Sequence, residues 1–408
     1  MSWTHQVKMN VGVARVAFPT IAGAGAGALR RRLFLCGALL AALFSAACAS
    51  RPEVGFLSPV AEVATGATAH TLLVATTRKR DDRLGTLFNG ERAKPLDYAK
   101  IEISVPEQHK AGEIEWASTA PGNPRTDFVV RQAAYLDGEK EFVRSLNAQL
   151  AARPRGSRKV LLFIHGYNTM FAEGLYRFGQ VVHDSKSPAV PVLFTWASRG
   201  QITQYVYDNN SATAARDDLE RTIRLIFASD AEQVNILAHS MGNWVTVEAL
   251  RQIKIAGQLP QAGKLGAIFL AAPDIDIDVF KSQMRRFGKP RKPFYIVLSR
   301  DDQALRASSF IAGGGNRLGA DGNTEELAAL GAVVIDLTDV AATDSSNHGK
   351  FAQLAEIAPQ LSAVLEKGVS GGADRLTPAQ NAVGETVGAL VSLPVMILGA
   401  PIKIIAGR

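Results

Sequence analysis

A serine lies between two small residues near the middle of the chain, in the segment Ala238–Gly242, which reads AHSMG. The apolar run 234–238 is typical of a buried strand, and a helical stretch follows the segment. Small residues two positions before and after a serine allow a strand and a helix to meet at a sharp, strained turn. Such a turn presents the hydroxyl of Ser240 at the edge of a sheet and predicts a nucleophile, although an ordinary strand-to-helix turn would show the same pattern.

A serine hydroxyl is unreactive at its own pKa and needs a neighbouring base. In folds that carry this turn, an acid and then a histidine follow the serine along the chain. Of the seven histidines, His348 is the one that follows Ser240, and it lies in a polar loop after the strand-like run 333–337. We therefore predict that His348 is the general base.

The acid that orients the base is expected in the loop after the preceding strand-like run, 294–298. A carboxylate there would stabilise the imidazolium without itself becoming protonated. Asp301 and Asp302 both lie in this loop, and we predict Asp302 as the acid, with Asp301 as the alternative. Four further aspartates near other strands remain competitors: Asp274, Asp276, Asp278 and Asp336.

Hydrolysis through a serine also needs backbone N–H groups that stabilise the negatively charged oxygen of the intermediate. One is expected from Met241, because the residue after the serine begins a helix. The other is expected from Tyr167, in the loop 165–168 that follows the apolar run 159–164. His165 is expected to brace this loop and not to act as the base. The supporting residues of the loop and the turn are His165, Gly166, His239 and Gly242.

These residues must be positioned by strands that alternate with helices. Continuous apolar runs, typical of strands covered on both faces, recur at 159–164, 190–196, 234–238, 265–271, 294–298 and 333–337. Helical stretches separate several of them, notably 172–184, 212–229 and 244–256. Strands and helices in alternation predict βαβ units. We therefore predict an α/β fold with a mostly parallel central sheet flanked by helices.

Composition excludes several classes of protein. The chain has 408 residues, of which 47% are hydrophobic and 20% charged, so it is long enough for a large core and is not disordered overall. Residues 1–47 hold five of the net seven positive charges, and the remainder has 40 basic and 38 acidic residues. That balance predicts no basic face and no nucleic-acid partner. Histidines do not cluster at metal-ligand spacing, so we expect neither a metal nor another cofactor.

The N-terminal segment 1–47 is expected to be an export signal or an N-terminal anchor. Arg30–Arg32 precede the uncharged apolar run 33–47, and small residues follow. The run is short for a membrane span. Small residues directly before Cys48 resemble a lipoprotein signal, which makes Cys48 a candidate for lipidation. We expect export to the periplasm or cell envelope, with membrane association through a Cys48 lipid or through the apolar C-terminal tail.

Together these segments resemble α/β-hydrolases, and more narrowly a bacterial family of α/β-hydrolases of unknown function described as esterase/lipase-like. The resemblance covers about residues 71–365. It rests on the segments 73–78, 163–168, 194–200, 238–243, 271–276, 302–305 and 317–319. It implies the alpha/beta-hydrolase fold, with Ser240 as nucleophile, Asp302 as acid and His348 as base. It also favours Asp302 over Asp301. The natural substrates of the family are not established.

The expected organisation has four parts. Residues 1–47 form the export signal or anchor, 48–69 a linker, 70–367 the hydrolase domain, and 368–408 a linker with an apolar tail. The tail is apolar over 386–402 but is interrupted by glycine and proline. We expect it to dock on the domain, to lie at a membrane surface or to mediate assembly.

We predict a serine hydrolase that cleaves a carboxylic ester, such as an acyl lipid or an envelope ester, through an acyl-enzyme on Ser240. The partner would be a small-molecule or lipid ester, and the pocket rims are expected at 199–210 and 313–321. A serine amidase or peptidase would use the same groups. A non-catalytic envelope protein on a hydrolase scaffold is the alternative from a different class.

Overall fold

The computed structural model describes residues 51–52, 54–260, 263–288, 290, 292–342, 344–355, 390–397 and 400–407. The expected export signal, the candidate lipidation site Cys48 and the expected linker at 368–372 lie outside these residues. All the described residues except Arg51 belong to one unit, 52–408. Among the described residues, no helix has the length and apolar character needed to cross a bilayer.

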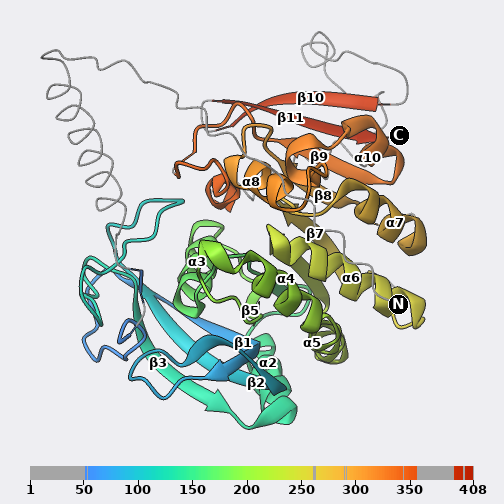
Figure 1. Cartoon of the computed structure of the whole chain (residues 1–408). Helices are drawn as coiled ribbons and strands as arrows, with labels where there is room; N and C mark the ends of the chain where they lie inside the picture. The colour runs from blue at the N-terminus through green and yellow to red at the C-terminus, as the bar shows by residue number, and fades with distance from the viewer. Residues whose placement is uncertain are drawn as a thin grey trace, which may run out of the picture. The chain divides into compact units, whose positions relative to one another are not determined.

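The described residues form one sheet of eleven strands (Figure 1), in the order β10-β11-β9-β8-β7-β6-β4-β5-β1-β2-β3. Seven neighbouring strands from β9 to β1 are joined by parallel pairs. The other pairs are antiparallel. The strands are β1 (Thr68–Arg80), β2 (Phe88–Val105), β3 (Val129–Leu136), β4 (Lys159–Ile164), β5 (Val190–Thr195), β6 (Gln233–His239), β7 (Leu265–Ala271), β8 (Phe294–Leu298), β9 (Ala332–Asp336), β10 (Leu390–Ile397) and β11 (Ala400–Gly407).

Helices connect the parallel strands and cover both faces of the sheet (Figure 1). The helices are α2 (Gly138–Ala151), α3 (Phe171–Asp184), α4 (Tyr205–Ala214), α5 (Arg216–Ala228), α6 (Met241–Ile255), α7 (Ile277–Phe287), α8 (Gln303–Ile311), α9 (Leu318–Asp321) and α10 (Thr324–Ala329), with short 3₁₀ turns η1 (Ile202–Gln204) and η2 (Lys350–Ala355). The prediction of a mostly parallel sheet flanked by helices is confirmed.

The apolar runs of the sequence are continuous because both faces of the central strands are buried. Successive side chains of a strand point to opposite faces. In β4, Leu162 packs in a core shared with α2, α5 and α6, whereas Phe163 packs in a second core shared with α3. Phe194 and Leu193 of β5 divide between the two cores in the same way. The sheet therefore has no solvent-facing side at its centre.

The residues before β1 contact the domain, although they form no helix or strand. The segment 48–69 was expected to be a linker. In the structure, Leu57 is buried, its N–H bonds to the carbonyl of Gly85, and the N–H of Val60 bonds to the carbonyl of Val130. The described part of this segment is thus attached to the first strands of the sheet through its backbone.

The C-terminal residues extend the sheet as a hairpin. β10 pairs with β11, and β11 pairs antiparallel with β9, so that Ile404 lies opposite Ile335. Ile402 and Ile404 are buried in a small core with Ile335 and Leu337. The boundary expected after residue 367 places these two strands outside the domain, whereas in the structure they cover the edge of β9. An uncovered edge strand exposes unpaired backbone groups, and β11 pairs with those of β9. The apolar side chains of the tail are buried in the same place.

Candidate active site

Ser240 occupies the turn between the last residue of β6 and the first residue of α6. Its φ of 53° and ψ of −124° place a residue with a Cβ in a strained region of backbone space. Its N–H donates to the carbonyl of Ala271 at 3.0 Å, and its own carbonyl accepts from the N–H groups of Asn243 and Asp274 at 3.1 and 3.2 Å. These bonds hold the strained turn that the sequence predicts at this position.

Two glycines allow the loop after β4 to pass close to this turn. A Cβ on Gly166 would lie 2.6 Å from the Cβ of Ser240. A Cβ on Gly242 would lie only 2.3 Å from the carbonyl oxygen of His165. Neither position has room for a larger residue, so the structure places both predicted supporting glycines where the loop and the turn meet.

Asp302 and His348 contact each other directly. Nδ1 of His348 lies 2.7 Å from Oδ2 of Asp302, whose side chain is fully buried. Because a carboxylate accepts hydrogen bonds, Nδ1 carries a proton, and in the neutral tautomer Nε2 then has the lone pair that a general base requires. The second oxygen, Oδ1, accepts the N–H of Leu305 and caps the N-terminus of α8 at 2.9 Å. Both oxygens of Asp302 are therefore fixed.

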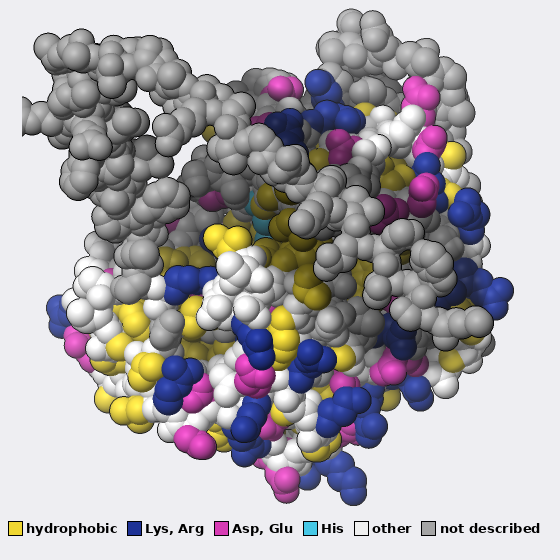
Figure 2. Space-filling model, in the orientation of Figure 1, with side chains coloured by type: hydrophobic (Ala, Val, Ile, Leu, Met, Phe, Trp, Pro, Cys, Tyr) yellow, Lys and Arg dark blue, Asp and Glu magenta, His cyan; other side chains and the backbone are white. Residues whose placement is uncertain are grey.

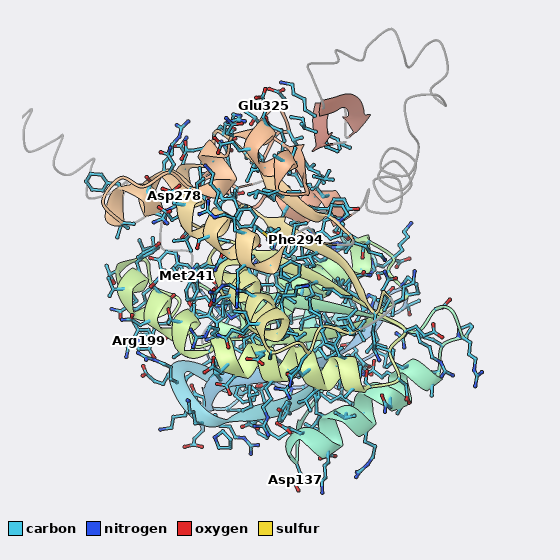
Figure 3. The ribbon with its side chains drawn as sticks, turned by 90° about the vertical axis from the view of Figure 1, so that its right-hand side faces the viewer. Asp137, Arg199, Met241, Asp278, Phe294 and Glu325 are labelled. Carbon is cyan, nitrogen blue, oxygen red and sulfur yellow. The ribbon has the colours of Figure 1, made fainter. Side chains whose placement is uncertain are left out.

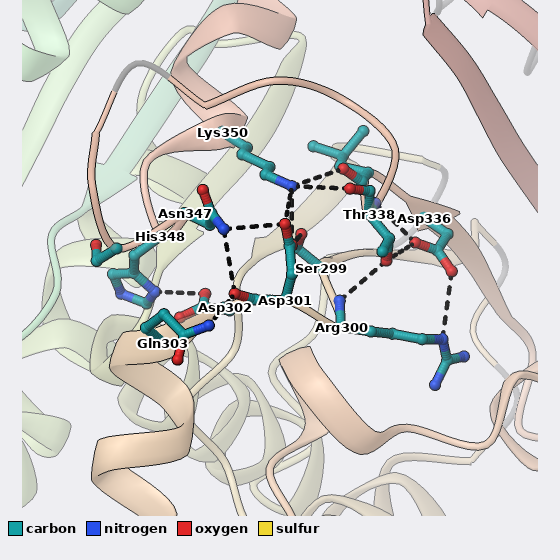
Figure 4. A network of polar contacts seen from close by, with 12 residues as sticks. Ser299, Arg300, Asp301, Asp302, Gln303, Asp336, Thr338, Asn347, His348 and Lys350 are labelled. Atoms are coloured by element: carbon teal, nitrogen blue, oxygen red, sulfur yellow. Dashed lines mark hydrogen bonds and ion pairs between the residues drawn. The ribbon is translucent and has the colours of Figure 1, made fainter.

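Asp301, the alternative acid, points to a different set of groups (Figure 4). Nζ of Lys350 donates to its two carboxylate oxygens at 2.8 and 2.9 Å, and Nδ2 of Asn347 donates to Oδ2 at 2.9 Å. Burial opposes ionisation of Asp301, but the hydrogen bonds from Lys350 and Ser299 outweigh it and lower its pKa. Asp301 thus braces the loop that carries His348.

The other aspartates that the sequence left open have positions of their own. Oδ1 of Asp274 lies 3.3 Å from Nε of Arg317. Asp276 caps the N-terminus of α7, where Asp278 is exposed. Asp336 accepts a hydroxyl hydrogen bond from the residue two positions further along. None of these carboxylates has a hydrogen bond to His348 among the contacts of the described residues.

His239 joins the turn to the loop of the base. Its ring centroid lies 4.6 Å from that of His348, and its Nε2–H donates to the carbonyl of His348 at 3.3 Å. On its other side it stacks on Phe351 at 4.3 Å. Burial and the neighbouring His348 hold the pKa of His239 well below its ordinary value, so this imidazole is neutral. Figure 2 shows that hydrophobic side chains line the hollow at the centre of this face of the molecule.

His165 braces its loop through both ring nitrogens. Nδ1–H donates to the carbonyl of Gly166 at 2.8 Å, so Nε2 accepts the hydroxyl of Thr195 at 2.9 Å. The ring stacks on Trp196, whose Nε1–H donates to the carbonyl of His165 at 3.0 Å. Burial, together with the nearby Arg78, lowers the pKa of His165 to about 3. This geometry is that of a structural histidine.

Arg78 was not identified as a site residue from the sequence. Its guanidinium is fully buried and donates to Oγ1 of Thr195, the carbonyl of Ser198 and the carbonyl of Thr169, each at 2.8 Å. Burial lowers its pKa to about 10. The guanidinium joins the end of β1 to the loops after β4 and β5. The feature of the sequence that could have identified Arg78 is its place in the segment 73–78, on which part of the family resemblance rests.

Asp208 was also not identified. It is fully buried on α4, where Oδ2 accepts the N–H of Asn168 at 3.1 Å and the hydroxyl of Ser198 at 2.5 Å. Its other oxygen accepts the N–H of Arg199 at 3.0 Å. Burial raises the pKa of Asp208, against the effect of these hydrogen bonds. Arg78 and Asp208 therefore both bond to the loop after β4 and to the loop after β5.

Met241 and Tyr167, the two predicted oxyanion donors, are the residue after Ser240 and the residue after Gly166, which approaches Ser240. Met241 is the first residue of α6, a position whose N–H has no acceptor within the helix. In Figure 3, Met241 is on the same side of the molecule as Arg199 and Asp278. Tyr167 lies in the loop after β4, and its hydroxyl donates to the carbonyl of Ile202. Their role as oxyanion donors stays a prediction.

Comparison with known proteins gives a family match over more than half of the chain. The model of a family described as alpha/beta hydrolase of unknown function (DUF900) matches residues 139–365. No curated protein matches the chain. Within the described residues, no group of three or more His, Cys, Asp or Glu side chains could hold a metal ion.

Several solved structures of esterases and lipases are similar at low identity. Lipase B of Aspergillus fumigatus is 13% identical over 41% of this chain and 43% of its own, with a TM-score of 0.28, so the match spans less than half of that enzyme. Esterase B of Lactobacillus rhamnosis is 9% identical over 86% of this chain and 100% of its own, with a TM-score of 0.34. A thermostable esterase of Pseudomonas putida is 13% identical over 72% and 83%, with a TM-score of 0.30.

Proposed function

The chain belongs to this family of alpha/beta hydrolases of unknown function, and we propose that it is a serine hydrolase that cleaves a carboxylic ester through an acyl-enzyme on Ser240. The observation that carries the proposal is the 2.7 Å hydrogen bond between buried Asp302 and His348, in a loop packed against the strained turn of Ser240. The loop of this acid and imidazole contacts His239, the residue before Ser240. An acid, an imidazole and a serine that lie close together form the arrangement that activates a hydroxyl.

In the proposed reaction, Oγ of Ser240 attacks the ester carbonyl and Nε2 of His348 accepts its proton. Asp302 holds Nδ1–H and stabilises the imidazolium. The N–H groups of Met241 and Tyr167 stabilise the oxyanion. His348 then protonates the departing alcohol, which leaves an acyl group on Ser240. A water molecule, deprotonated by His348, attacks this acyl group, and the acid is released with the serine restored.

An amide or peptide bond could be cleaved by the same groups, and ester cleavage is proposed because alcohols are better leaving groups than amines. We also propose that the substrate is encountered at the cell envelope. This part of the proposal is supported by the sequence of residues 1–48 alone, with its basic cluster, apolar run and Cys48.

The test is covalent labelling of the purified full chain with a fluorophosphonate probe. We expect labelling of the wild type and its loss in Ser240→Ala and in His348→Ala. Ser118→Ala, at an exposed serine in the loop after β2, is the matched control and should be labelled like the wild type. Circular dichroism shows whether each variant is folded. A folded wild type that is not labelled would contradict the proposal and favour a non-catalytic scaffold.

A further inference from the structure

A cavity of about 390 Å³ lies at the edge of the sheet where Ser240 is located. Two aromatic side chains, Tyr205 of α4 and Trp244 of α6, form part of its wall. The other apolar lining residues are Val206, Val279, Ile311 and Ala312. A cavity of this size with mostly apolar walls is typical of a small-molecule site.

The cavity adjoins the proposed reaction centre on two sides. The N–H of Asp274, one of its lining residues, donates to the carbonyl of Ser240 at 3.2 Å. The ring of Tyr205 packs edge-on against that of Tyr167, with 5.1 Å between centroids. An ester whose carbonyl lies between Ser240 and Tyr167 can therefore place one of its chains in the cavity.

The charged groups in the cavity wall already have partners within the protein. Asp274 lies 3.3 Å from Arg317, accepts the hydroxyl of Ser308 at 2.6 Å and accepts that of Tyr205 at 3.3 Å. Asp276 caps the N-terminus of α7, where the helix dipole stabilises a negative charge. Two carboxylates and one guanidinium give the charged part of the wall a net negative charge. A ligand carboxylate would be repelled by this wall and would lose its hydration on entering.

Exposed apolar side chains surround this region on separate elements. Val206 of α4 is 68% exposed and Ile311 at the end of α8 is 53% exposed. Their neighbours Ile202 and Phe310 are 74% and 86% exposed. A group of exposed apolar side chains next to a cavity is typical of a surface that contacts an apolar ligand. Val206 and Ile311 belong both to this exposed apolar group and to the wall of the cavity.

We propose that this cavity binds an uncharged hydrocarbon chain of the ester, so that the enzyme selects long-chain neutral esters over short or charged ones. The inference rests on the proposed function, because the chain is placed relative to a carbonyl at Ser240. Each methylene that is fully buried can raise kcat/KM by up to ~4-fold. Between acetate and octanoate, a gain of at least ~10-fold is therefore expected even with partial burial.

The experiment compares p-nitrophenyl esters below their solubility limits, using the full chain. The acyl series runs from acetate to octanoate, and the mono-p-nitrophenyl ester of suberic acid gives the octanoate length with a terminal carboxylate. Val279→Trp narrows the cavity at a side chain that is 40% exposed, so the change does not disturb the core. Val63→Trp, at a side chain 77% exposed in the segment before β1, is the matched control.

We expect the wild type and Val63→Trp to prefer octanoate over both acetate and the suberate ester. Val279→Trp should lose most of the preference for octanoate and keep acetate hydrolysis and fluorophosphonate labelling. Equal rates along the series, or an unchanged preference in Val279→Trp, would overturn the cavity assignment while labelling of Ser240 upholds the serine hydrolase. A folded wild type with neither labelling nor hydrolysis would refute both proposals.

Discussion

Asp302→Asn removes one charge from the proposed triad and changes the side-chain volume very little. In the structure, Oδ1 of Asp302 accepts the N–H of Leu305 and Oδ2 accepts Nδ1–H of His348. An asparagine that keeps its oxygen on Leu305 turns its NH2 group toward His348. Nδ1 must then hold the lone pair and Nε2 the proton, so His348 can no longer accept the proton of Ser240.

The lost charge also has an electrostatic cost. The side chain of Asp302 is fully buried, and that of His348 is 17% exposed. With about 4 Å between the centres of the carboxylate and the imidazolium, and an effective dielectric constant of about 20, their attraction is about 4 kcal/mol. Because ~1.4 kcal/mol corresponds to a tenfold change in rate, we expect kcat to fall by ~10³-fold. KM should change little, because the carboxylate contacts the imidazole of His348 and has no proposed contact with the substrate.

The assay is steady-state hydrolysis of p-nitrophenyl acetate, with the rate of fluorophosphonate labelling measured in parallel. Asp301→Asn is the matched control, because it changes the neighbouring carboxylate in the same loop. It should lower the free energy of unfolding, since it leaves buried Lys350 without its charged partner. Its effect on kcat should be much smaller than that of Asp302→Asn. Urea unfolding separates the two effects.

Asp302 is not the acid if the kcat of Asp302→Asn stays within tenfold of the wild type while Asp301→Asn loses activity. That result would make Asp301 the acid and would mean that the loop rearranges when substrate binds. Similar losses of stability and activity in both variants would instead show that the loop acts as one structural unit and that the two carboxylates have no separate roles.

Three further predictions concern the residues that hold the loops. Arg78→Lys keeps the charge but loses at least two of the charged hydrogen bonds, so the free energy of unfolding in urea should fall by ~3 kcal/mol or more; no change would contradict the bracing role. His165 has a folded pKa of about 3, so between pH 6.5 and 3 only the unfolded chain binds its proton, and stability falls as pH falls, by ~2 kcal/mol from pH 7 to pH 5. His165→Gln should show a shallower pH dependence in the same assay, and an equal slope would refute the assignment. Gly242→Ala places a Cβ 2.3 Å from a carbonyl oxygen of the loop after β4, and it should lower kcat at least ~10-fold by displacing that loop from Ser240.

Local features of the sequence were sufficient to predict the central strands β4 to β9 and the turn of Ser240. The run predicted at 159–164 is β4, and the runs at 265–271 and 294–298 are β7 and β8. The strands could be predicted because burial on both faces makes these runs continuously apolar. The turn could be predicted because it needs small residues two positions before and after the serine. The hairpin of β10 and β11 was outside the expected domain boundary, because an apolar stretch with glycine and proline does not show which strand edge it covers.

The sequence by itself was sufficient to predict Ser240 as nucleophile and His348 as base, because a strand, a turn and a helix around Ser240 are set by neighbours within a few positions. The sequence favoured Asp302 over Asp301, but only the tertiary structure showed that Asp302 contacts His348 whereas Asp301 contacts Lys350, since the contact with His348 spans 46 residues and depends on how two loops pack. The same holds for Arg78, whose bond to Thr195 spans 117 residues. A charged side chain can be buried only where other groups hydrogen-bond to it. For Arg78 these groups are far away in the sequence, and only the folded chain brings them together.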